Sequence, residues 1–177
     1  MDGKTPETGK KKKSLLIFGC ICAVGICVLI AYIVNILTPL DRILDYCVQV
    51  RAQEDGALEI TYQYRWKVLN DSKEGPLTWV SLGIPNSRCE LLGYTGAISG
   101  LKNGFYGDGL IEFELDRAYK KGEVAEFGFT IRQEDMLCRN KKAGGLPFYD
   151  FMPGWFNEIA VEHYLFVWED GTYVMET

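Results

Sequence analysis

The feature that most constrains this chain is an uninterrupted apolar stretch close to its N-terminus. Residues 15–37 read LLIFGCICAVGICVLIAYIVNIL and contain no acidic or basic side chain. As a helix rising about 1.5 Å per residue, this stretch spans roughly 35 Å, which is enough to cross the hydrocarbon core of a bilayer with some tilt. We therefore predict a transmembrane helix over residues 14–38, which contacts the lipid bilayer through residues 15–37. A short tail (1–13) precedes it and a folded domain (41–177) follows it.

A cleaved signal is the alternative to a permanent anchor. Cleavable signal peptides have an apolar region of about 7–15 residues that ends in small residues at the cleavage site. Here the apolar stretch is longer and closes with Ile36, Leu37, Thr38 and Pro39. Residues 17–20, IFGC, partly match a lipoprotein signal, but Phe18 is too bulky for that pattern. The sequence favours an uncleaved signal anchor.

The positive charges that flank the apolar stretch predict its orientation. Four consecutive lysines directly precede it, whereas Arg42 and Arg51 are the basic residues in the comparable window behind it: Lys10, Lys11, Lys12 and Lys13 form the predicted topology signal. Basic residues near a span are retained in the cytoplasm. We therefore expect a single-pass plasma-membrane protein whose N-terminus is cytoplasmic and whose domain at 41–177 is extracellular. The link between span and domain is too short for a stalk, so the domain is expected close to the lipid surface.

The charge balance of the outer domain limits its partners. The whole chain has a formal net charge of −5, although basic residues outnumber acidic ones within the first forty positions. The acidic excess therefore lies in residues 41–177. An acidic domain lacks the electrostatic attraction to phosphates on which nucleic-acid binding depends, so we predict no nucleic-acid partner.

Alternating apolar residues predict that the outer domain is a β protein. Residues 57–68, ALEITYQYRWKV, alternate strictly between apolar and polar side chains, which fits a half-buried strand and no helix. A similar run precedes it, and Asp55 and Gly56 form a hairpin-turn signal between the two. Further strands are predicted near 80–84, 89–94, 111–116, 125–132, 159–168 and 172–174. This spacing predicts an immunoglobulin-like antiparallel β-sandwich.

Catalytic and metal-binding patterns are sparse in this sequence. The one histidine, His163, lies on a predicted strand, and we read it as a sheet residue rather than a catalytic base. Of the six cysteines, three lie in the span and three outside it (Cys20, Cys22 and Cys27; Cys47, Cys89 and Cys138). The outer three show no paired spacing of the kind that zinc sites have. We predict no enzyme activity, no metal and no cofactor.

An aromatic stretch is the most suggestive candidate for function. Residues 148–156 read FYDFMPGWF, and two interpretations stay open. The stretch could plug one end of the sandwich, with Pro153 and Gly154 supplying the reversal that tucks the following rings inward. Alternatively it is an exposed surface for a glycan or a peptide, since Tyr and Trp are enriched on such surfaces. The candidate binding residues are Tyr149, Phe151, Trp155 and Phe156.

Several short motifs give the chain a family resemblance. They are GPLTWV at 75–80, GIPN at 83–86, DRAYKKGE at 116–123 and PGWF at 153–156, behind a lysine-preceded anchor. The chain resembles uncharacterised single-anchor membrane proteins of Gram-positive gut bacteria and is distantly similar to the YciQ-like predicted membrane proteins. The resemblance implies an extracytoplasmic sandwich and carries over no catalytic or ligand-binding residue.

Two functions follow from these features as expectations. The first is a membrane-anchored protein of the bacterial cell surface whose sandwich binds or scaffolds a partner, either an envelope protein or a glycan. The alternative is a carbohydrate-binding module that uses an exposed aromatic loop containing Tyr149, Trp155 and Phe156.

Overall fold

A computed structural model describes residues 7–106, 109–139, 145–154, 156, 159–169 and 173–176, with the backbone alone described for 7–15, 103–106 and 173–176. The chain divides into two compact units, Met1–Thr38 and Pro39–Thr177. Each unit is described below by itself.

The first unit contains one helix, α1 (Glu7–Leu37). Its segment Leu16–Leu37 is long and apolar enough to cross a membrane, and its side chains are exposed within this unit. Thr38 ends the helix, where its backbone N–H donates to the Val34 carbonyl (2.9 Å) and its hydroxyl donates to the same oxygen (2.7 Å). The helix begins earlier than the predicted span, because the Lys and Glu residues before it are good helix formers.

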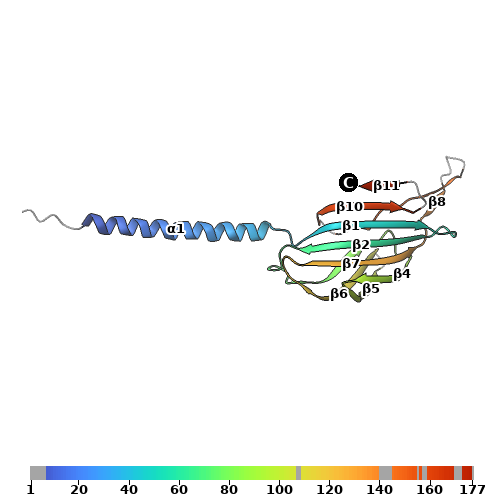
Figure 1. The fold of residues 1–177 in the computed structure, drawn as a ribbon, viewed down its shortest axis with the longest axis horizontal. Coiled ribbons are helices and arrows are strands. Elements are labelled where there is room, and N and C mark those ends of the chain that lie inside the picture. Colours follow the sequence, from blue (N-terminus) through green and yellow to red (C-terminus); the bar gives the residue numbers. More distant parts are fainter. Residues whose placement is uncertain are drawn as a thin grey trace, which may run out of the picture. The chain divides into compact units, whose positions relative to one another are not determined.

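Six strands of the second unit form one mixed sheet (Figure 1). Its order is β11 (Tyr173–Glu176), β10 (Val161–Trp168), β1 (Asp41–Ala52), β2 (Leu58–Val68), β7 (Val124–Gln133) and β4 (Cys89–Gly96). β1 and β2 form the predicted antiparallel hairpin, with Tyr46 opposite Tyr64. Gly56 has a φ of 86° in the turn between them, a left-handed conformation that suits glycine.

Two smaller sheets complete this unit. One has the order β3 (Leu77–Gly83), β6 (Leu110–Tyr119) and β5 (Ile98–Tyr106). The other is a short hairpin of β8 (Leu137–Arg139) and β9 (Pro147–Tyr149). In the three-stranded sheet, β3 and β5 are the two outer strands and β6 is central.

The core lies between the six-stranded and three-stranded sheets. β2 shows the predicted alternation, with every second side chain buried from Leu58 to Val68 while Gln63 and Arg65 are exposed. Across the interface, the ring of Phe113 on β6 lies 4.8 Å from that of Phe129 on β7. The prediction of a mainly β domain behind one N-terminal apolar helix is confirmed.

The strands of the structure differ from the prediction in two respects, one of pairing and one of number. β10 runs parallel to β1, with Ile43 opposite Val161 and Val50 opposite Trp168, so the expectation of a purely antiparallel sandwich is wrong. The long connection before β10 allows this direction, because a parallel neighbour needs a crossover rather than a tight turn. β5 was not predicted, because its register with β6 shifts twice and its sequence, ISGLKNGFY, does not alternate.

Candidate functional site

A cleft of about 470 Å³ lies along β3, next to the beginning of β1 and the end of β2. It combines aromatic and acidic side chains with small polar ones. Its lining residues are Pro39, Leu40, Asp41, Trp66, Val68, Asn70, Glu74, Gly75, Pro76, Leu77, Thr78, Trp79, Val80, Ser81 and Ile159. The walls therefore come from four separate segments of the chain.

Backbone hydrogen bonds hold the floor of this cleft together. The backbone N–H groups of Leu69 and Asn70 both donate to the Leu40 carbonyl, at 2.8 and 3.0 Å. These bonds fold the chain that leaves β2 back over the start of β1. The Asn70 Oδ1 accepts hydrogen bonds from the Ser72 backbone N–H (3.0 Å) and the Ser72 hydroxyl (2.6 Å), which makes an Asx turn. This turn leads the chain to Glu74 at the cleft.

The carboxyl group of Asp41 is the electrostatically perturbed group in the cleft. Burial raises the pKa of Asp41, the nearby Trp66 indole N–H partly opposes this, and the charge of Glu74 raises the pKa further. Two carboxyl groups that share one site disfavour the charge on each other. A positively charged ligand group would relieve this repulsion.

The indole N–H of Trp66 is a buried hydrogen-bond donor in the wall of the cleft. The side chain is only 3% exposed, and its Nε1 has no acceptor in hydrogen-bonding geometry among the described residues. A hydrogen-bonding contribution from this N–H lowers the pKa of the Asp41 carboxyl. The Nε1 atom is itself buried away from solvent, so we interpret the indole as part of the packed wall of the cleft.

Trp79 on β3 is the exposed aromatic group of the cleft. Its side chain is 41% exposed, and the Lys102 ammonium lies 3.3 Å from the centroid of its ring. This is a cation–π contact between the two outer strands of the three-stranded sheet. No lysine or arginine is among the residues that line the cleft. The cleft therefore favours neutral or cationic ligands over anionic ones.

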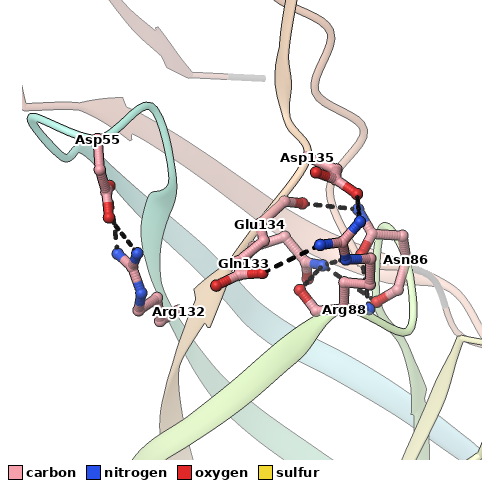
Figure 2. A network of polar contacts seen from close by, with 7 residues as sticks. All are labelled: Asp55, Asn86, Arg88, Arg132, Gln133, Glu134 and Asp135. Atoms are coloured by element: carbon pink, nitrogen blue, oxygen red, sulfur yellow. Dashed lines mark hydrogen bonds and ion pairs between the residues drawn. The ribbon is translucent and has the colours of Figure 1, made fainter.

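A polar network holds the loop that follows β3 (Figure 2). Gln133 at the end of β7 is fully buried, and its Nε2 lies within hydrogen-bonding distance of the Asn86 carbonyl (3.1 Å), the Asn86 Oδ1 (2.5 Å) and the Arg88 carbonyl (3.1 Å). In return the Asn86 Nδ2 donates to the Glu134 carbonyl at 3.0 Å. Arg88 also forms ion pairs with Glu134 and Asp135. We interpret this network as structural, because its contacts bind a loop to a strand end.

The Asp55–Arg132 ion pair lies beside this network in Figure 2 and joins the β1–β2 turn to β7. The hydrogen bonds from Arg132 and from the Ala57 backbone N–H lower the pKa of Asp55. Both side chains contact solvent, and such pairs contribute little to stability on average.

The described aromatic candidates pack against the six-stranded sheet. Tyr149 packs on Trp168 of β10 with ring centroids 5.4 Å apart, and Phe151 packs on Phe166 at 5.6 Å. Phe156 lies edge-on to Tyr46 of β1, with ring centroids 5.4 Å apart, and Tyr46 is paired with Tyr164 of β10. All three are half-buried against the core. Trp155 lies outside the described residues.

The other predicted residues lie apart from the cleft. The helix α1 includes the four lysines of the predicted topology signal, of which only the backbone is described: Lys10, Lys11, Lys12 and Lys13. The His163 Nδ1 lies 3.2 Å from the Asp45 Oδ1 on the neighbouring strand and 3.1 Å from the Leu44 carbonyl oxygen.

The cysteines outside the span are free thiols of intermediate exposure, and burial raises the pKa of Cys89 to about 11. Within the described residues, no three His, Cys, Asp or Glu side chains are grouped to hold a metal ion.

Sequence reasoning missed the cleft and its residues. Asp41, Trp66, Glu74 and Trp79 share no common motif, and they meet through the packing of the two sheets and the Asx turn at Asn70, which leads the chain to the start of β3. One weak signal was present, because Trp79 stands on the polar side of the alternation at 80–84, where a large exposed ring is unusual.

Comparison with known proteins shows no family. No family model and no curated protein match the chain. Among solved structures, the chain is similar to an M1 zinc metallopeptidase from Deinococcus radiodurans at 10% identity and a TM-score of 0.45, covering 71% of this chain and 31% of that one. It is also similar to leukotriene A4 hydrolase from Saccharomyces cerevisiae at 13% identity and a TM-score of 0.42, covering 60% and 18%. The chain thus spans less than a third of either protein, and no activity is transferred from them.

Proposed function

We propose that this chain is a single-pass membrane protein of the cell envelope whose β domain is a binding module, with the cleft beside β3 as its contact site. One observation carries the proposal. The cleft brings the carboxyl groups of Asp41 and Glu74 together beside an outer strand. These groups come from segments that fold together at this place.

The orientation is part of the same proposal. The lysines before the span outnumber the arginines soon after it, which supports a cytoplasmic N-terminus and an extracytoplasmic domain. The short link from Leu37 to Asp41 supports a binding site near the lipid surface, because three intervening residues reach only about 14 Å when fully extended. The immunoglobulin-like description of the sandwich and the Gram-positive resemblance belong to this proposal as well.

A topology experiment tests the orientation. Protease added to intact cells should digest residues 41–177 and spare the tail. Replacement of Lys10, Lys11, Lys12 and Lys13 by glutamine should give molecules in both orientations. Protection of the 41–177 region in cells that carry the native lysines would overturn the proposed orientation.

A cross-linking experiment tests the contact site. A photoreactive benzoylphenylalanine at Thr78, an exposed cleft position, should give a covalent adduct in intact cells. The same group at Gln63, which is exposed on β2 away from the cleft, serves as the matched control and should give none. Mass analysis of the adduct then distinguishes a peptide from a glycan. Equal adducts at both positions, or none at Thr78, would contradict a binding role for the cleft.

The carbohydrate-binding alternative needs exposed rings. Tyr149 and Phe156 are half-buried against the core, which reduces the ring surface they offer to a sugar. A glycan adduct at Thr78 would favour a carbohydrate ligand, but in the cleft rather than on the aromatic stretch.

A further inference from the structure

The edge of β3 is the feature that identifies a ligand class for the cleft. β3 hydrogen-bonds to β6 on one side only among the described strands. The cleft is lined by six consecutive residues of this part of the chain, from Pro76 to Ser81. In an outer strand, alternate N–H and C=O groups point away from the sheet and form a template for another strand. This template faces the cleft.

The far end of β3 is already covered and fixed. On the paired side, the N–H of Ile84 continues the ladder toward β6 by donating to the Gly109 carbonyl at 2.8 Å, and the network of Figure 2 holds the loop behind it. Gly154 packs directly against the Gly83 carbonyl, at the end of the strand. With respect to the described residues, the open part of the edge is therefore Leu77 to Ser81, about 17 Å of preformed strand. A preformed edge spares a ligand the entropic cost of ordering the site.

The chemistry of the opposite wall complements an extended peptide. A lysine or arginine side chain would neutralise the carboxyl pair of Asp41 and Glu74, in a cleft whose lining holds no competing basic residue. A saccharide would leave the strand edge unpaired. The Lys102 contact also occupies part of the Trp79 ring on which a sugar would stack.

We propose that the cleft binds an extended peptide segment that adds as a further strand to the β3 edge and places a lysine or arginine side chain between Asp41 and Glu74. This inference rests on the proposed function of the cleft and names its ligand. Main-chain hydrogen bonds to β3 supply the affinity, and the carboxyl pair supplies the preference for a basic residue, as in other cases of strand addition.

Two peptide pools test this inference with the full chain in detergent micelles. Both pools are fluorescein-labelled eight-residue peptides randomised among Val, Ile, Thr and Tyr, with lysine fixed at position four in one and glutamate in the other. Fluorescence anisotropy should show about tenfold or greater tighter binding of the lysine pool. Equal binding of the two pools, or no binding of either, would overturn the inference.

Matched charge variants test the role of the carboxyl pair. The double variant Asp41→Asn with Glu74→Gln should lose the preference for the lysine pool. The control double variant, Glu54→Gln with Glu90→Gln, removes the same charge at exposed positions outside the cleft and should keep it. Loss of the preference in both would point to the net charge of the domain instead of the cleft.

Hydrogen exchange locates the bound peptide. With the lysine pool bound, backbone amides at 77–81 should exchange more slowly, while those of β5 at the opposite edge of the same sheet should not. Slowing at β5 and not at β3 would refute strand addition to β3. Chitotriose serves as the saccharide probe. If it slows exchange at 77–81 and neither peptide pool binds, the peptide inference is wrong while the binding function stands. If neither peptide pool nor chitotriose binds and the Thr78 adduct is absent in cells, both are wrong.

Discussion

Gly154 passes so close to Gly83 that a Cβ atom on Gly154 would lie 2.4 Å from the Gly83 carbonyl oxygen. The same backbone accepts a hydrogen bond at the Gly154 carbonyl from the buried Tyr46 hydroxyl, at 2.8 Å. The backbone at Gly154 thus lies between the end of β3 and the core tyrosines. Only a residue without a side chain fits there.

The first prediction concerns this contact. Gly154→Ala should lower the free energy of unfolding by about 1–3 kcal/mol, because an added methyl group must displace backbone atoms that are already in contact. Gly100→Ala is the matched control, since a Cβ at Gly100 meets nothing within 4 Å. Denaturant unfolding of the full chain in detergent, followed by tryptophan fluorescence, measures both. Equal stability of the two variants would contradict the close approach.

The second prediction concerns the aromatic stretch. Phe156→Ala should cost about 3 kcal/mol, because the ring packs edge-on against Tyr46, Tyr64 and Trp66. Phe148→Ala should cost far less, since that ring is 45% exposed. The same unfolding assay tests both. An unchanged midpoint for Phe156→Ala would support a binding role for this ring in place of a packing role.

The third prediction concerns the buried amide of Gln133. Gln133→Leu should destabilise the fold by about 1–3 kcal/mol, because the Asn86 and Arg88 carbonyls would lose their donor at a part-buried site. Gln63→Leu, on the exposed face of β2, should change stability by about 0.5 kcal/mol or less. If the two substitutions cost the same, the network of Figure 2 contributes no stability.

The fourth prediction concerns the pH dependence of stability at Asp41. Its folded-state pKa is raised above the ordinary value of 3.8, so the folded protein binds this proton more tightly than the unfolded chain does. The resulting stabilisation is fully present below about pH 4 and is lost as the pH rises through the raised pKa. Asp41→Asn should therefore unfold at a higher midpoint than the native chain at pH 7, with the difference vanishing near pH 3.

Asp55 provides a control of opposite sign. Its pKa is lowered by Arg132 and the Ala57 N–H, so its contribution is present above the ordinary pKa and is lost as the pH falls through the lowered one. Asp55→Asn should be less stable than the native chain at pH 7 and equal to it at strongly acidic pH.

A stabilising Asp41→Asn substitution would also show that the Asp41 carboxylate is kept at a cost in stability, as binding groups often are.

The sequence by itself determined the features that depend on local pattern. The uncharged stretch at 15–37 predicts an apolar helix because its length and composition suffice, whatever the rest of the chain does. The alternation at 57–68 predicts both the strand β2 and its buried face, because a period of two matches the pleat of a strand. The Asp55–Gly56 signal predicts the β1–β2 hairpin for the same local reason.

Only the tertiary structure decided which distant segments meet. An alternating pattern identifies the apolar face of a strand but not its neighbour, so the parallel pairing of β1 with β10 could not be predicted. The same limit applies to the cleft, where Asp41, Trp66 and Trp79 stand on three strands of two sheets and share no motif. Their proximity results from the packing of one sheet on the other and from the turn at Asn70. Packing of that kind depends on the shape of the whole core, which no single stretch of sequence encodes.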